Sequence, residues 1–350
     1  MQQWSKNLFN HMFYRIKKLY YDTLRRCLGD WRLFLYDERR HEHEVIRSHY
    51  HDNTANRLKN KTIIYVANGF CNHAGLSDRL KGMITLYGWC KEHRLDFRIL
   101  HTHPFDLHNY IVPNQYDWRI NNSMMCYNKR NTEVCHLMLN QLVRKFIDSG
   151  EVVSLEHHWF LKRVLSTKKK QIHFYTNMQP ESNEWFGTCF HELFKPSPSL
   201  AFEIIHHRQA IGGAYISVSF RFMQLLGDFI DCDGDTLPTE QQDDLIRRSI
   251  LVLQELKGQN QDITHILVTA DSIRFLQKAK QLSFVYIVEG KVGHINFESS
   301  DEVYMKTFLD FFMISNAQKV YLAKSEKMYN SDFARRASMI NCRPFNIIEY

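Results

Sequence analysis

The feature that most constrains the fold is a regular alternation of short apolar segments with longer amphipathic ones in the second half of the chain. The apolar, strand-like segments are 214–222, 264–270, 284–288 and 319–323. Each is followed by a segment of helical periodicity, and these are 239–256, 272–279, 303–317 and a last one from about residue 332. Neighbouring parallel strands need a crossover, usually a helix, so this order predicts a parallel sheet covered by helices.

The first half of the chain shows the same strand–helix–strand order around KTIIYVAN (61–68) and DFRILHTH (96–103). The segment between them, from residue 77 to about 93, has helical spacing, and QIHFYTNM (171–178) is a further predicted strand. The proline-containing segment FKPSPSL (194–200) predicts a break between two units.

We therefore predict an α/β protein of two Rossmann-like domains that face each other across a cleft. The first comprises residues 61–205 and the second residues 206–350, which suits a chain of 350 residues. The mixed segment 151–165 is left without an assignment.

Residues 1–60 form a predicted basic extension ahead of the first domain. Up to residue 36 apolar residues recur at helical spacing, and lysines and arginines fall largely on the other side. Such a helix can lie on an anionic membrane, where each basic residue adds about 1 kcal/mol, or it can dock against its own domain. The charged, histidine-rich residues 37–60 predict a linker.

The net charge and the composition indicate which classes of partner the protein can bind and in which cellular compartment we expect it. The net charge of +7 fits an anionic ligand, a membrane surface or nucleic acid, but no RNP-type or zinc-finger pattern is present, so we expect no nucleic-acid partner. The eight cysteines form no CxxC pair and predict reduced thiols. We find no signal peptide and no apolar run of about 18 residues, and we expect a cytoplasmic protein.

Charged, glycine and hydroxyl residues follow four of the predicted strands. In open parallel sheets the ligand binds at the carboxyl ends of the strands, so these loops form the predicted site. Its residues are Gly75, Asp78 and Arg79 in the first domain, and Arg221, Asp228, Asp271, Ser272, Ser331 and Phe333 in the second.

This combination fits a nucleoside diphosphate. An arginine offers a planar pair of donors to phosphate oxygens, and helix N-termini add partial positive charge. Each residue also has a structural interpretation: Arg221 can form a salt bridge, Asp271 with Ser272 and Ser331 can cap helices, and Asp78 can pair with Arg79.

Metal binding is not predicted. Asp231, Asp233 and Asp235 have the spacing of a calcium loop, but Thr236 and Gln242 stand where an EF-hand needs glycine and glutamate. Cys71 and His73 have no third ligand nearby in the sequence. We expect no metal and no cofactor.

The order of these motifs resembles that of the GDP-fucose-dependent fucosyltransferases, a superfamily that includes nodulation and core α1,6-fucosyltransferases and protein O-fucosyltransferases. The motifs are GLSDRLKGM, VSFRF followed by GD, VTADS and NSDFARRAS, all within residues 61–340. Arg221 matches the family arginine, whereas Ser219 stands at the family histidine and Asp78 at the family asparagine.

The resemblance implies a GT-B fold and metal-independent transfer of a sugar, most directly fucose from GDP-fucose. It implies a glycan or lipid-linked oligosaccharide acceptor in bacterial-type surface polysaccharide synthesis, with the N-terminal helix on the inner face of the membrane. Arg221 would stabilise the leaving diphosphate, Asp78 would be a candidate base, and the other predicted site residues would bind the donor. Because the family histidine is replaced, a non-catalytic sugar-nucleotide or glycan-binding protein with a degenerate transferase fold remains the alternative.

Overall fold

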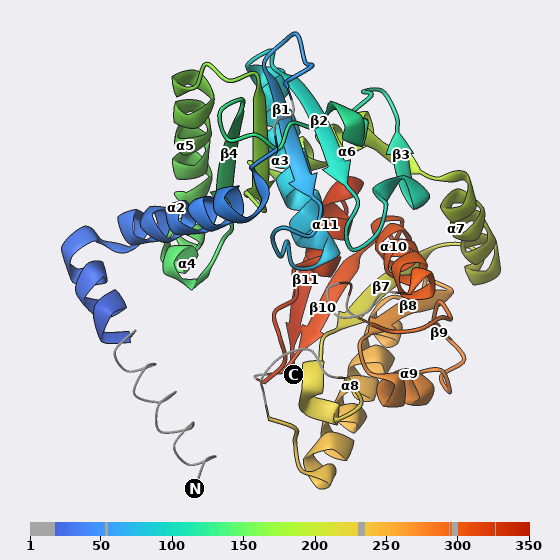
Figure 1. The fold of residues 1–350 in the computed structure, drawn as a ribbon. Coiled ribbons are helices and arrows are strands. Elements are labelled where there is room, and N and C mark those ends of the chain that lie inside the picture. The colour runs from blue at the N-terminus through green and yellow to red at the C-terminus, as the bar shows by residue number, and fades with distance from the viewer. Residues whose placement is uncertain (1–17, 53–54, 230–234, 294, 296–299, 326) are drawn as a thin grey trace, which may run out of the picture.

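A computed structural model of the chain describes residues 18–52, 55–229, 235–293, 295, 300–325 and 327–350 (Figure 1). Two parallel sheets dominate it, as predicted. The first has the order β2-β1-β5-β4 and is made of β1 (Thr62–Ala67), β2 (Asp96–His101), β4 (Thr132–Leu137) and β5 (Gln171–Thr176). All six residues of β1 are buried, as expected of a central strand covered on both faces.

The second sheet has the order β11-β10-β7-β8-β9, and every pairing within it is parallel. Its strands are β7 (Tyr215–Phe220), β8 (His265–Ala270), β9 (Val285–Tyr286), β10 (Val320–Lys324) and β11 (Phe345–Glu349). The helices between them are α8 (Thr239–Gln259), α9 (Ile273–Ala279), α10 (Asp301–Ser315) and α11 (Phe333–Ile340). The predicted α/β class and the alternation of elements are confirmed.

In both sheets the strand order reverses direction beside the first strand of the unit. From β1 the chain adds β2 on one side and β5 on the other, and from β7 it adds β8 on one side and β10 on the other. Such a switch point opens a crevice at the carboxyl ends of the two strands, where open α/β sheets bind their ligands. The fold therefore places the loops after β1 and β7 at the two crevices.

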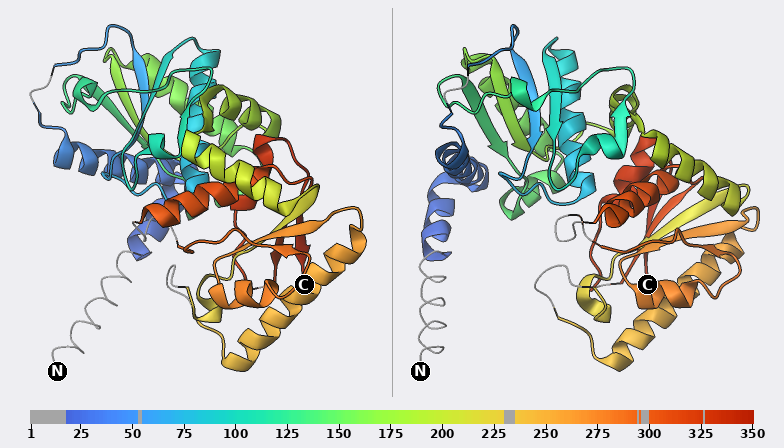
Figure 2. Two further views of the ribbon diagram at one scale, coloured as in Figure 1. Left: turned by 90° about the vertical axis from the view of Figure 1, so that its right-hand side faces the viewer. Right: turned by 45° about the vertical axis from the view of Figure 1, so that its right-hand side comes forward.

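Helices join the two sheets into one body. The first sheet carries α3 (Leu76–Glu92), α5 (Val152–Ser166) and α6 (Asn183–Leu193), and α10 and α11 of the second unit pack against this layer (Figure 2). Gly187 of α6 permits a close approach of α11, because an added Cβ there would lie 2.7 Å from the Met339 carbonyl oxygen. The predicted domain boundary at residue 205 lies inside α7 (Pro198–Ile211), and the two-domain division remains a proposal.

The chain between the sheets and helices contains shorter elements. These are the antiparallel pair β3 (Ile111–Pro113) and β6 (Phe194–Pro196), the helix α4 (Arg144–Asp148), and the 3-10 turns η1 (Leu107–Asn109), η2 (Asn122–Met124), η3 (Gln141–Val143) and η4 (Met223–Leu226). The last of these turns directly follows Arg221 and Phe222.

The N-terminal extension differs from the prediction. Residues 18–28 are helical, Gly29 breaks the helix with φ +74°, and α2 (Asp30–His49) then runs through most of the segment expected to be a linker. Glu38 of α2 contacts His136 Nδ1 at 2.5 Å and accepts a hydrogen bond from the Met138 N–H at 3.0 Å, which ties the helix to β4. Residues 1–17 lie outside the described part of the chain.

Residues 18–28 project away from both sheets (Figures 1 and 2). Leu19 is 70% exposed and Tyr20 50% exposed, while the Tyr21 hydroxyl donates a hydrogen bond to Asp37 of α2 at 2.8 Å. Among the described helices, none combines the length and apolar character needed to cross a bilayer.

Candidate functional site

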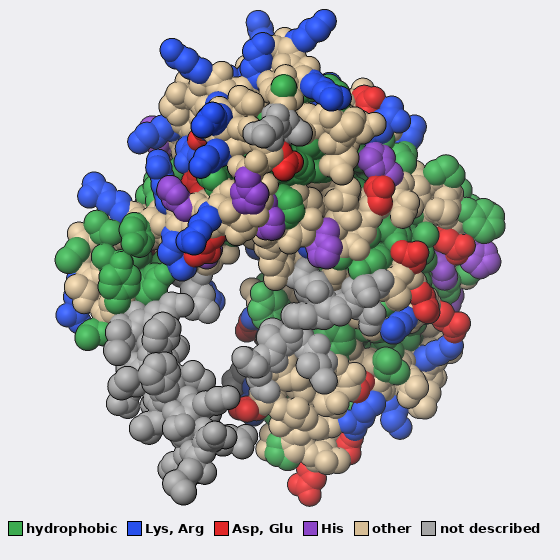
Figure 3. All heavy atoms as spheres, in the orientation of Figure 1, with side chains coloured by type: hydrophobic (Ala, Val, Ile, Leu, Met, Phe, Trp, Pro, Cys, Tyr) green, Lys and Arg blue, Asp and Glu red, His purple; other side chains and the backbone are tan. Residues whose placement is uncertain are grey.

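The carboxyl ends of the two sheets adjoin at one point. Gln179 follows β5, and Arg336 lies in the first turn of α11, which follows β10. The Arg336 guanidinium donates a hydrogen bond to Gln179 Oε1 at 2.9 Å and a second to Asp332 Oδ2 at 2.7 Å. Figure 3 shows Lys, Arg and His side chains gathered on the upper part of this face, over the first sheet.

Arg221 directly follows β7 at the switch point of the second sheet, as predicted. Its guanidinium forms an ion pair with Asp271 at 2.9 Å and lies 5.1 Å from the centre of the Phe229 ring. Its carbonyl accepts the Tyr329 N–H at 3.2 Å, which fastens the loop after β10 beside it. The side chain is 18% exposed, so the charge reaches solvent at the sheet edge.

Asp271 is the anchor of this edge. Its two carboxylate oxygens accept the N–H groups of Phe222 and Met223, each at 2.8 Å, and one of them also pairs with Arg221. Met223 has φ +54°, a conformation rarely adopted by residues other than glycine, so the carboxylate holds a strained turn directly after the arginine. Burial raises the pKa of Asp271, while Arg221 and the backbone N–H groups oppose that rise.

Asp228 and Ser272 form a second link between the loops after β7 and β8. The Ser272 hydroxyl donates to Asp228 Oδ2 at 2.9 Å, and the Arg274 N–H donates to the same oxygen at 2.8 Å. Ser272 also caps α9 by accepting the Phe275 N–H at 3.2 Å. Asp228 Oδ1 is buried and has no hydrogen-bond partner within the described residues. The predicted helix cap is present, and Asp228 completes it from a separate loop.

Ser331 and Phe333 lie at the start of α11. The Ser331 hydroxyl accepts the Phe333 N–H at 3.3 Å, and the Phe333 ring packs edge-on against Phe311 of α10 at 5.2 Å between centroids. The sequence suggested Ser331 as a helix cap, but the N-cap of α11 is Asp332, whose side chain makes no capping hydrogen bond, and Ser331 lies one residue before it. Tyr329 connects this loop to Arg221.

The first-domain residues occupy the loop after β1. Gly75 precedes α3 as its N-cap, and Asp78 forms an ion pair with Lys81 at 2.9 Å, whereas the sequence suggested Arg79 as its partner. The Arg79 side chain is buried, with 3% of the residue exposed, and it donates to the carbonyls of Ala74 and His103, each at 3.1 Å. These contacts make Arg79 an anchor of the loop.

Two histidines that surround Arg79 are buried. His73 Nδ1 lies 3.1 Å from the Cys71 carbonyl and His101 Nδ1 lies 3.0 Å from the Phe105 carbonyl. Burial and the nearby Arg79 charge lower the pKa of both histidines, to about 3 for His73. His73 is therefore a packing residue that stays neutral, as its sequence context suggested.

Glu156 was missed by the sequence analysis. It is fully buried on α5, where its Oε2 accepts the Gln179 N–H at 2.8 Å, so it supports the loop that meets Arg336. Burial raises its pKa to about 8. A signal was available, because Glu156 interrupts an apolar stripe of i, i+4 spacing whose other members are Val152, Phe160 and Val164.

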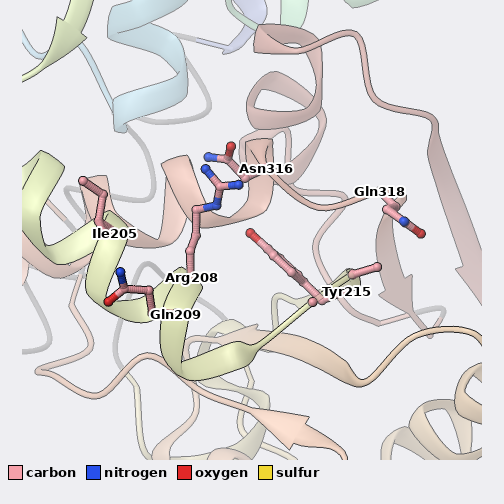
Figure 4. A pocket seen from close by; sticks show the side chains of 8 residues that line it. Ile205, Arg208, Gln209, Tyr215, Asn316 and Gln318 are labelled. Carbon is pink, nitrogen blue, oxygen red and sulfur yellow. The ribbon is translucent and has the colours of Figure 1, made fainter.

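Two hollows of the surface are lined by none of the predicted site residues. One of about 410 Å³ is lined by Arg208, Tyr215 and Gln318, at the amino ends of β7 and β10 (Figure 4). A second of about 450 Å³ borders α11 and includes Arg335 and Arg343. Because parallel sheets bind nucleotides at the opposite edge, we place the candidate site at the loops around Arg221 and not in these hollows.

Two solved structures of NodZ α1,6-fucosyltransferase are similar in fold to this chain. A crystal structure of NodZ α1,6-fucosyltransferase soaked with GDP-fucose superposes with a TM-score of 0.51 at 12% identity, covering 81% of this chain and 93% of the other. The chain has the fold of NodZ. NodZ co-crystallised with GDP gives 0.50 at 11% identity, covering 80% of this chain and 92% of the other.

A structure of POFUT1 in complex with GDP gives a TM-score of 0.48 at 10% identity, covering 83% of this chain and 99% of the other. No protein-family model and no curated protein matches the sequence. The likeness to NodZ confirms the predicted architecture, while the roles of the site residues stay predictions.

Proposed function

We propose that this protein is a glycosyltransferase that takes its sugar from a sugar nucleotide, with GDP-fucose as the donor and a glycan or lipid-linked oligosaccharide as the acceptor. The observation that carries the proposal is the position of Arg221 at the switch point of the second sheet, in a chain with the NodZ fold. NodZ crystals were soaked with GDP-fucose, and NodZ was also co-crystallised with GDP, which favours a guanine nucleotide as ligand.

Arg221 would stabilise the leaving diphosphate. As the bond between sugar and phosphate breaks, negative charge develops on the phosphate oxygens and the sugar becomes oxocarbenium-like. A guanidinium carries five N–H donors in a planar fork, a geometry that fits the oxygens of a diphosphate. Asp271 would thus orient the arginine, Asp228 with Ser272 would hold the neighbouring loop, and Ser331 and Phe333 would line the phosphate side. In this mechanism the arginine supplies the charge that a metal ion supplies in other transferases.

The first-domain loop would supply the acceptor side. Asp78 remains our candidate base, because its Oδ1 is held by Lys81 while the side chain keeps 32% of its surface exposed. Gly75 would allow a close approach of the backbone to the donor, and Arg79 would act through the loop it anchors. Asp78→Asn is expected to lower turnover while GDP affinity is retained.

The donor is tested by thermal unfolding with GDP, UDP, CMP and their sugar conjugates. GDP and GDP-fucose should raise the melting temperature, since a ligand at one hundred times its Kd stabilises the folded state by about 2.7 kcal/mol. Stabilisation by UDP without GDP would refute the guanine donor. A protein that responds to none of the nucleotides would refute the sugar-nucleotide site.

A non-catalytic binding protein is the second candidate function. It is favoured by Ser219, which stands where the family has histidine and donates or accepts a hydrogen bond with Thr269 at 2.7 Å, in a buried position. Neither hydroxyl is a useful base at neutral pH. Release of fucose from GDP-fucose in the presence of acceptor glycans would exclude this candidate, and binding without turnover would favour it.

We also propose that the N-terminal extension attaches the protein peripherally to the cytoplasmic face of a membrane. Leu19, Tyr20 and Leu28 are exposed on the helix that projects from the body, and Arg25 and Arg26 lie beside them. Full-length protein should float with vesicles containing anionic phosphatidylglycerol at low salt, and a form lacking residues 1–28 should not. Equal flotation of the two forms would contradict the proposal.

A further inference from the structure

Two helices of the first domain are fastened together at a histidine-rich contact. Trp89 of α3 packs against Phe160 of α5 with 5.4 Å between ring centroids, and it stacks flat on His157 of α5 at 4.7 Å with an interplanar angle of 5°. One turn further along, α3 ends with Glu92, and His93 is its C-cap. The stack fixes the plane of the His157 ring and directs its edge toward these two residues.

The nitrogen and oxygen atoms at this contact converge on one point. His93 Nε2 lies 3.1 Å from His157 Nε2, and His157 Nε2 lies 3.8 Å from Glu92 Oε2. The three ligand atoms all lie within 4.8 Å of one another. Two imidazole nitrogens bound to one zinc ion at about 2.0–2.1 Å and a tetrahedral angle are about 3.4 Å apart, close to the spacing of the two rings.

A hydrogen bond between the two rings also requires a short distance, but the Glu92 carboxylate, 3.8 Å from His157 Nε2, lies outside hydrogen-bond reach of that ring. A cation uses all three groups, since both imidazoles bind it as neutral ligands and the carboxylate supplies negative charge. The C-terminus of α3, a helix of 17 residues, adds partial negative charge at the same place.

We propose that Glu92, His93 and His157 form a binding site for a divalent transition metal, with zinc as the fitting ion and water in the remaining position. Two imidazoles and one carboxylate suit zinc, nickel or copper, and they disfavour calcium and magnesium, which prefer oxygen ligands alone. The bound ion would link α3 to α5 across the surface of the first domain.

This metal site is separate from the proposed transferase site. α3 begins at the carboxyl end of β1 and runs back along the sheet, so Glu92 and His93 lie at the other end of that helix from Asp78. The ion would therefore stabilise the domain and leave sugar transfer unaffected, and its presence does not depend on which function the protein has.

Calorimetric titration with Zn²⁺ tests the site, using chelator-treated protein that carries no histidine tag. Wild type should bind one equivalent, and His93→Gln should weaken binding by at least about tenfold, the loss expected from removing even a supporting contact. His158→Gln is the matched control, because His158 is the exposed neighbour on α5 outside the cluster, and it should bind as wild type does. Equal affinities of the His93 and His158 variants, or no binding by wild type at millimolar Zn²⁺, would overturn the proposal.

A spectroscopic measurement distinguishes the loss of a metal ligand from a folding defect in the variants. Cu²⁺ bound to His157 should quench the fluorescence of the stacked Trp89, in wild type and in His158→Gln but not in His93→Gln. Glu92→Gln is a second variant on an exposed side chain, and it should show the same direction of loss. Circular dichroism in chelator must match that of wild type for each variant; equal quenching in all of them would refute the assigned ligands.

Discussion

Replacing Arg221 by alanine should abolish sugar transfer and weaken GDP binding. The guanidinium lies at the switch point of the second sheet, where a diphosphate would bind, and it cannot lose its charge. Removing one preorganised donor from a site of developing negative charge costs about 10²–10³ in rate, so we expect at least that loss in kcat. Arg221→Lys should recover binding better than rate, because the transition state needs the planar pair of donors more than the ground state does.

The Arg221 variants need two controls: a substitution of another arginine, and a substitution of Asp271, which holds Arg221 in place. Arg247→Ala serves as the first, since Arg247 is a largely exposed partner of Asp244 on α8. Asp271→Asn serves as the second, because it keeps the shape of the anchor and removes its charge. Kinetics with one donor and one acceptor decide between the roles: wild-type kcat/KM in Arg221→Ala would make Arg221 a structural ion-pair residue.

Glu156→Gln should stabilise the protein at neutral and higher pH. The ordinary pKa of this carboxyl is 4.5 and burial raises it to about 8 in the folded state, so between these values the unfolded chain binds fewer protons than the native one. The free energy of unfolding therefore falls as pH rises through that window. Glutamine keeps an acceptor for the Gln179 N–H and does not ionise, so Glu156→Gln should gain stability relative to wild type as pH rises through this window.

Urea unfolding at pH 5, 6, 7 and 8 measures this effect. The difference between Glu156→Gln and wild type should be small at pH 5 and should grow steadily toward pH 8. Glu151→Gln provides the control, because Glu151 is exposed at the start of the same helix. A constant difference at all four pH values would show that Glu156 does not titrate in this window.

The strands of the second domain could be predicted because their information is local. β7, β8 and β10 are short apolar runs followed by helical patterns, and each was placed within about two residues of its observed ends. Their carboxyl ends must meet at one edge of a parallel sheet, and this alone placed Arg221 near Asp271 and Ser272. The particular pairings, such as the ion pair of Arg221 with Asp271, depend on side-chain geometry that no spacing reveals.

The prediction of a linker at residues 37–60 was wrong, because the partners of its charged residues lie far away in the sequence. Glu38 and Glu42 make α2 look solvent-exposed, yet both are buried, because their partners are His136 and Arg163. These contacts span separations of 98 and 121 residues. When the partner of a buried charged residue is that distant in sequence, the local sequence resembles that of an exposed segment, and only the fold reveals the contact.

Partners that lie outside the local sequence also explain why β4 was not predicted as a strand. Its segment, Thr132–Leu137, includes Glu133 and His136, which break the apolar run expected of a strand in a parallel sheet. Glu133 pairs with Arg163 at 2.6 Å and His136 with Glu38 at 2.5 Å, so the strand tolerates both.

The packing of α11 on α6 has a consequence for how the protein is made. The side of α6 that carries Gly187 is covered by the backbone of α11 at Met339, and α11 begins 140 residues after the end of α6. At about 5–20 residues per second, a ribosome needs roughly 7–30 s to make that stretch. During this time the nascent first domain exposes an apolar strip that its own residues cannot cover, so we expect chaperone binding to newly made chains to end only when α11 leaves the exit tunnel.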